Sequence, residues 1–131
     1  MSIELKMLLW SVVLGLVQIA LAATLCTAQR GLAWNAGPRD DVKPPVTGVA
    51  GRLERASRNF AETFPFFAVG VLMLALLQRS TAETALGAQL YFWARVAYVP
   101  LYAAGIAYVR TAVWAVALVG LLMVLKPLFG A

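Results

Sequence analysis

The sequence predicts an all-α integral membrane protein, built as a four-helix bundle that crosses the bilayer several times. Its 131 residues are 62% hydrophobic and only 13% charged, whereas charged residues make up about 25% of an ordinary soluble domain. The apolar residues also gather in four stretches that approach the roughly 20 residues of a transmembrane helix. These stretches are residues 7–28, 60–77, 88–108 and 112–129.

Little of the chain remains outside these spans, so we expect a single domain over residues 1–131. The long connection, from residue 29 to about residue 53, is rich in turn-forming residues and is predicted to be non-helical. The second helix should begin near Arg52. Thr81 is the expected N-cap of the third helix. The last span is predicted to be the weakest, because Lys126 and Pro127 interrupt its end.

The net charge of +5 does not indicate nucleic-acid binding, because the basic residues border apolar spans and form no solvated patch. Their distribution predicts topology instead, with loops one and three cytoplasmic and both termini outside. The residues on the predicted cytoplasmic side are Arg30, Arg39, Lys43, Arg52, Arg55, Arg58 and Arg110. The opposite side holds Lys6, Arg79 and Lys126.

The chain has no histidine and one cysteine, which excludes metal sites built on those ligands and any internal disulfide. We interpret Cys26 as a small apolar residue that faces lipid or a neighbouring helix. Gln18, the strongly polar residue inside the first span, is expected to form a hydrogen bond across helices.

A polar stripe enters the second span. Arg55, Arg58 or Asn59, and Glu62 share one helical face at i, i+3 or i+4, and i+7. A charged stripe at this depth must face protein or water, because an unpaired charge in lipid is costly. Two interpretations remain open, an ion-pair cluster between helices and a binding site for a small polar ligand.

The third span carries a second stripe, with Arg95, Tyr98 and Tyr102 on one face and Gly105 continuing it. Arg95 is expected to pair with Glu62 or a helix carbonyl. The hydroxyls of Tyr98 and Tyr102 are equally suited to a neighbouring helix and to a ligand. Tyr91 and Trp93 are expected in an aromatic belt at the membrane interface.

Together the stripes predict a site for a small peptide-like ligand with two carboxylates and an amine. Arginine forks match carboxylates, while Glu62 and Asn59 would hold an amine or amide. Arg110 lies at the expected tight connection before the last span, where a cation would favour a thiolate over a thiol. Thr111 would donate to the same sulfur. A cytoplasmic anchor is the alternative role for Arg110.

These motifs resemble MAPEG, the membrane-associated proteins in eicosanoid and glutathione metabolism. The pattern in question is Arg55-x-x-Arg58-Asn59-x-x-Glu62-x-x-Pro65-x-Phe67, followed by Arg95-x-x-Tyr98-x-x-x-Tyr102. Its ending, with Arg110 and Thr111, is similar to bacterial members. Thr63 stands where the leukotriene-synthase branch often has a tyrosine.

The resemblance implies a homotrimer that binds glutathione between adjacent subunits, in a bacterial inner membrane. By this resemblance, the glutathione-binding residues are Arg30, Arg55, Arg58, Asn59, Glu62, Tyr98 and Tyr102, and Arg110 stabilises the thiolate. The expected function is that of a glutathione-dependent transferase or peroxidase. Its second substrate would be a lipophilic small molecule, an electrophile that enters laterally from the membrane lipids. The alternative is a non-catalytic lipid-binding or scaffold protein of the same fold.

Overall fold

The computed structural model describes residues 1–130, so the last residue of the predicted domain, residue 131, lies outside the described part. Within that part every regular element is a helix, which agrees with the predicted all-α class. The helices are α1 (Ile3–Arg30), α2 (Leu32–Ala36), α3 (Gly48–Leu77), α4 (Ala82–Ala103) and α5 (Tyr108–Phe129).

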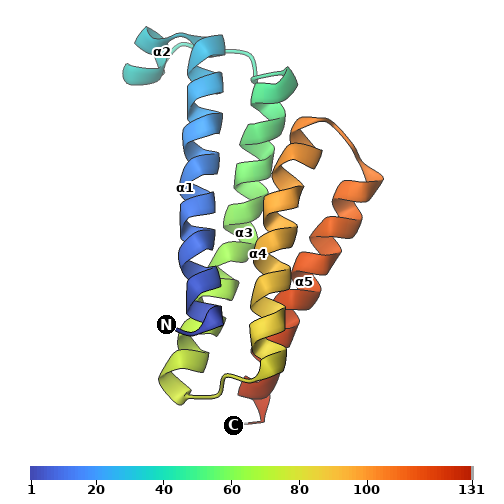
Figure 1. Ribbon diagram of the computed structural model, residues 1–131. Coiled ribbons are helices and arrows are strands. Elements are labelled where there is room, and N and C mark those ends of the chain that lie inside the picture. Colours follow the sequence, from blue (N-terminus) through green and yellow to red (C-terminus); the bar gives the residue numbers. More distant parts are fainter. Residues whose placement is uncertain (131) are drawn as a thin grey trace.

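The long helices α1, α3, α4 and α5 run side by side (Figure 1). One end of the bundle carries the α1–α3 connection, with α2, and the α4–α5 connection. The other end carries both termini and the α3–α4 connection (Figure 1). The two connections predicted to share one side of the membrane therefore do lie at the same end of the molecule.

Three of the helices, α1, α3 and α5, are long and apolar enough to cross a membrane. The expectation that the last span is the weakest is therefore wrong. Lys126 and Pro127 lie in the final turn of α5, so the apolar part of the helix is long enough without them. It is α4 that does not qualify, because polar residues such as Glu83, Gln89 and Arg95 make it less apolar than the other long helices.

Several helix boundaries differ from the sequence-based ones. The first loop contains the short helix α2, and α3 begins at Gly48 rather than near Arg52. The last two long helices are joined by residues 104–107, where Gly105 has a positive φ of 77°. Glycine takes this conformation without strain, which allows α4 to end there. Arg110 consequently lies in the first turn of α5 rather than in the connection, and Gly105 does not continue the α4 stripe.

The helices α4 and α5 pack with their backbones in contact. A Cβ atom on Gly120 would lie 2.5 Å from the carbonyl oxygen of Gly87 and 2.7 Å from the amide nitrogen of Tyr91. Only glycine fits at such a crossing. This close approach lies near the start of α4 and in the middle of α5, away from the 104–107 connection, and it holds the two helices together there.

Buried hydrogen bonds link the helices elsewhere. Thr81 is the N-cap of α4, as predicted, and forms a capping box with Thr84. The Thr84 hydroxyl also donates to the buried carboxylate of Glu4, at 2.7 Å. Gln18 is buried, but its side-chain amide has no hydrogen-bond partner within residues 1–130. The bond expected from Gln18 across helices is therefore not formed there.

The aromatic-belt interpretation is wrong for Tyr91. Its ring is 1% exposed and stacks on Phe67 with 4.1 Å between centroids. Its hydroxyl shares a 3.0 Å hydrogen bond with Thr63. Trp93, in contrast, is 61% exposed on the outer surface of the bundle. Tyr91 is therefore part of the α3–α4 interface, and Thr63 has a structural partner inside the bundle.

Candidate functional site

A polar pocket of about 300 Å³ lies between α3, α4 and the first turn of α5. All seven residues that line it are among those predicted from the sequence. They are Arg55, Arg58, Asn59 and Glu62 from α3, Tyr98 and Tyr102 from α4, and Arg110 from α5. The two stripes thus meet in one cavity, although they are separated by more than thirty residues of sequence.

Local helix geometry explains how these side chains converge. On α3, positions 55, 58 or 59, and 62 recur at the helical repeat and so face the same way. On α4, positions 98 and 102 are one turn apart. Arg110 joins them because α5 turns back directly after α4, and from the first turn of α5 its guanidinium reaches the Tyr102 ring.

The Tyr102 ring is the central contact of the pocket. The guanidinium carbon of Arg110 lies 4.4 Å from the ring centroid, and that of Arg55 lies 5.9 Å from it. A cation within about 6 Å of an aromatic face is attracted by the ring quadrupole. Tyr98 packs edge-on against the same ring, with 5.5 Å between centroids. One ring therefore holds two arginines from different helices beside the cavity.

The charges around the pocket do not cancel within the chain. Its lining has three guanidinium groups and one carboxylate, an excess of two positive charges. Glu62 forms no ion pair within residues 1–130, and Arg58 pairs only with Glu54 of its own helix. The structure therefore does not show an ion-pair cluster between helices. Such a lining favours a ligand with more negative than positive charges.

Arg95 lies behind the pocket, and the prediction that it pairs with Glu62 or with a helix carbonyl is wrong. It is 1% exposed. Its Nη1 donates a 2.9 Å hydrogen bond to Oδ1 of Asn59, not to Glu62 or to a helix carbonyl. Its guanidinium carbon lies 4.3 Å from the Tyr98 ring centroid and 5.5 Å from that of Phe60. The flanking rings hold the cation on the level of Asn59, one turn away from Glu62.

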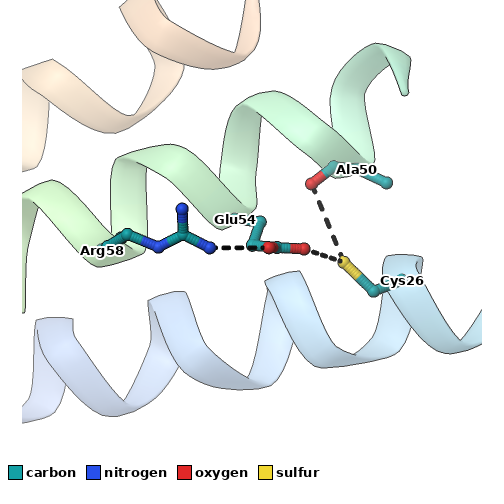
Figure 2. A network of polar contacts seen from close by, with 4 residues as sticks. All are labelled: Cys26, Ala50, Glu54 and Arg58. Carbon is teal, nitrogen blue, oxygen red and sulfur yellow. Dashed lines mark hydrogen bonds and ion pairs between the residues drawn. The ribbon is translucent and has the colours of Figure 1, made fainter. Parts of the chain in front are cut away.

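A second polar network, on the α1 side of α3, was not predicted. Figure 2 shows Glu54 between Arg58 and Cys26. Oε1 of Glu54 lies 2.9 Å from Nη2 of Arg58, and its Oε2 lies 3.2 Å from Sγ of Cys26. Sγ is also 3.9 Å from the carbonyl oxygen of Ala50. The i, i+4 spacing of Glu54 and Arg58 is the signal that would have identified this pair.

Two predicted site residues lie outside the pocket. Arg30 ends α1 and places its guanidinium 5.2 Å from the ring centroid of Trp34. Thr111 is exposed, and its hydroxyl donates to the carbonyl oxygen of Ala107 at 3.2 Å. Within one chain, neither residue is brought to the polar cavity.

An apolar groove of about 520 Å³ runs along α1 and α3. Its walls include Val12, Leu16 and Ile19 from α1 and Phe60 and Phe64 from α3. Glu54 and Arg58 border one end of it. Arg58 lines this groove as well as the polar pocket, so the two cavities lie on either side of a single side chain.

Comparison with known proteins places the chain in a family. No curated protein and no solved structure matches it. A family model described as the MAPEG family matches residues 7–128, which is nearly the whole chain. Together with the three helices able to cross a bilayer, this match makes the chain an integral membrane protein. The protein therefore belongs to the MAPEG family, as the motifs on its second and third spans indicated.

Proposed function

We propose that this protein is a glutathione-dependent membrane enzyme that conjugates or reduces lipophilic electrophiles. The observation that carries the proposal is the polar pocket, with three guanidinium groups and one carboxylate, beside an apolar groove. Membership of the MAPEG family supports the same class of activity. The pocket would hold the thiol substrate, and the groove would hold the lipophilic one.

The charges of glutathione complement those of the pocket. The tripeptide has two carboxylates and one ammonium group, and as a thiolate it carries a net charge of −2. The pocket lining has an excess of two positive charges. Arg55 and Arg58 would bind carboxylates through paired N–H donors, and Glu62 would accept hydrogen bonds from the ammonium group. Arg55 also lies 5.9 Å from the Tyr102 ring centroid, within reach of a weak cation–π contact.

Arg110 is the residue best placed to stabilise a thiolate. Its guanidinium is held over Tyr102 at the pocket. It also belongs to the first turn of α5, where the helix dipole adds partial positive charge. A cation and a helix N-terminus both lower the pKa of a bound thiol from its reference value of about 8.5. The proposed mechanism uses Arg110 for this purpose, and Thr111 has no part in it.

The apolar groove supplies a route for the second substrate. Apolar compounds concentrate in the bilayer, and the groove is bordered by α1 and α3, two of the membrane-capable helices. A compound lying in the groove would approach the polar pocket at Arg58, which lines both cavities. The thiolate of glutathione would then attack an electrophilic carbon and displace its leaving group, or attack a peroxide oxygen and break the O–O bond to release an alcohol. In the second case a second glutathione would convert the resulting sulfenic acid to glutathione disulfide and water.

We further propose that the protein functions as a homotrimer in a bacterial inner membrane, with loops one and three cytoplasmic. In the isolated chain, Arg55 and Glu62 are exposed on α3, a helix apolar enough to span the bilayer. Charged groups facing lipid are costly, so a neighbouring copy is needed to cover them. That copy could also bring its own Arg30 to the pocket. Native mass spectrometry in detergent should show a trimer, and a stable monomer would contradict this arrangement.

Isothermal titration calorimetry with glutathione tests the binding proposal. Wild-type protein should bind, and Arg55→Ala and Glu62→Gln should each weaken binding by about tenfold to a hundredfold, the range for a hydrogen bond to a charged group. Arg79→Ala is the matched control, since it removes an exposed arginine from the opposite end of the bundle. Absence of wild-type binding, or equal binding by all the variants, would refute the proposed site.

Turnover of a lipophilic electrophile by the protein in lipid nanodiscs then separates the two functional classes. The enzyme should form the glutathione conjugate or reduce a lipid hydroperoxide, and the rate should fall in Arg110→Ala. If glutathione binds without turnover of either substrate class, the protein belongs instead to the non-catalytic lipid-binding or scaffold class.

A further inference from the structure

We propose that Arg95 is a positioning residue that fixes the orientation of the Asn59 side-chain amide, so that Asn59 presents N–H donors to the ligand. This inference rests on the proposed function, because it names the chemistry of one contact within the glutathione pocket. It assigns Asn59 to an oxygen acceptor of the ligand, a carboxylate or peptide carbonyl, and removes it from any role in accepting hydrogen bonds from an amine.

The chemistry of arginine sets the direction of the hydrogen bond between Arg95 and Asn59. An arginine side chain has five N–H donors and no acceptor. The 2.9 Å contact from Nη1 of Arg95 therefore requires the amide oxygen of Asn59. An inverted amide would place two donors against each other. The orientation of this amide, which electron density alone often leaves ambiguous, is thus determined by the chemistry of its partner.

Arg95 cannot move to release the amide. It is buried, with the faces of Tyr98 and Phe60 within 4.3 and 5.5 Å of its guanidinium carbon. Within residues 1–130 it has no acidic partner. Asn59 supplies the hydrogen bond that the structure records for its guanidinium group. Rotation of the amide would therefore leave a buried cation without that acceptor, which is strongly unfavourable.

The Nδ2 side of the Asn59 amide is the side left for a ligand. Asn59 lines the polar pocket, and within residues 1–130 the structure records no hydrogen bond from its Nδ2. With Oδ1 held by Arg95, two N–H groups remain available to the cavity. Glu62 is then the charged hydrogen-bond acceptor of the pocket, and the arginines and Asn59 are hydrogen-bond donors. A ligand amine should be recognised at Glu62, and Asn59 should bind an oxygen.

The substitution Asn59→Asp tests the orientation, because the two alternatives predict opposite signs. Aspartate still accepts from Arg95 but has no N–H donor, and it adds a negative charge beside the ligand oxygen. We expect glutathione affinity to fall about tenfold or more, while the thermal stability of the unliganded protein is unchanged or higher. If the amide oxygen instead faced a ligand amine, the Asn59→Asp variant would bind glutathione as tightly as wild type or more tightly. That result would overturn the inference.

Substitutions at Arg95 test the positioning role. Arg95→Lys keeps a side chain that only donates and should retain most of the glutathione affinity. Arg95→Gln can donate or accept, so it frees the amide to rotate and should weaken binding about tenfold. Equal affinity for Arg95→Gln and wild type would show that Arg95 does not act through Asn59.

A double-mutant cycle on the unliganded protein keeps the test independent of glutathione. The effect of Asn59→Asp on thermal stability should depend on Arg95, so that the aspartate is neutral or stabilising beside Arg95 and destabilising in the Arg95→Gln background. Lack of coupling between the two substitutions would overturn the inference, and if Arg95→Gln does not fold, the glutathione affinity of Asn59→Asp decides it. If the cycle shows the coupling but wild-type protein binds no glutathione, the proposed function fails while the contact between Arg95 and Asn59 stands. If wild type binds and Asn59→Asp binds equally well, only the positioning inference fails.

Discussion

Tyr102 offers the sharpest test of how the pocket is organised, because its ring and its hydroxyl make separable contributions. The ring contacts the guanidinium groups of Arg110 at 4.4 Å and Arg55 at 5.9 Å. Cation–π interactions contribute about 0.5–1 kcal/mol at exposed sites and about 2 kcal/mol when desolvated. Arg110 is half-buried and close to the ring, whereas Arg55 is exposed and near the limit of the interaction. We assign about 1.5 kcal/mol to the first contact and about 0.5 kcal/mol to the second.

Replacing the ring should therefore weaken the preorganisation of the two arginines by about 2 kcal/mol, or roughly a thirtyfold change in affinity. We expect Tyr102→Leu to raise the dissociation constant for glutathione by this factor in titration calorimetry. Tyr102→Phe keeps both contacts and removes only the hydroxyl. Its affinity should fall by no more than about tenfold, the value of one hydrogen bond. Equal dissociation constants for Tyr102→Leu and wild type would refute the role of the ring.

Two further predictions concern the bundle that supports the pocket. Gly120→Ala should lower the free energy of unfolding by about 1–3 kcal/mol, because the added methyl group meets the backbone of α4. Gly15→Ala, which meets the side-chain ring of Phe60 at 2.9 Å and no backbone atom, should cost less. The reverse order in a thermal melt would contradict the α4–α5 packing. Thr63→Val should lower the free energy of unfolding by about 1 kcal/mol, because it removes the hydrogen bond to Tyr91. Glutathione affinity, measured by calorimetry, should be unchanged. A loss of affinity would indicate that Thr63 contacts the ligand.

Much of the site could be predicted from the sequence because helical periodicity is a strong local signal. Polar residues inside an apolar span must share a protected face, and their spacing identifies that face. The stripes on α3 and α4 were identified this way, and all the pocket residues that they contribute were named. The same reasoning located Thr81 as the N-cap of α4, since its signal lies within one helical turn.

The partners of these residues were harder to predict, because they depend on the rotation and depth of each helix. Charge alone suggested that Arg95 pairs with Glu62, whereas the structure places it against Asn59 between two rings. Tyrosine is a residue type typical of the aromatic belt, but the rotation of α4 places Tyr91 in the α3–α4 interface. Spacing along one helix does not contain this information.

The connection between α4 and α5 shows a different limit of sequence reasoning. An apolar run continues to residue 108 before the basic residue, which suggested that the third span ends there. A single glycine with positive φ ends α4 earlier, and α5 begins before Arg110. Hydropathy does not distinguish the apolar residues of a helix from those of a short connection. The placement of Arg110 at the start of a helix, on which the proposed mechanism depends, required the structure.

The formation of glutathione thiolate on the protein is the most direct test of the central claim, that this pocket binds glutathione and activates its sulfur. The ultraviolet absorbance of the thiolate can be followed as glutathione is added to purified protein near neutral pH. We expect a saturable thiolate signal for wild type. Arg110→Ala should still bind glutathione by calorimetry, but its thiolate signal should appear only nearer the reference thiol pKa of about 8.5. No saturable signal from wild type, or the same titration in both proteins, would contradict the account.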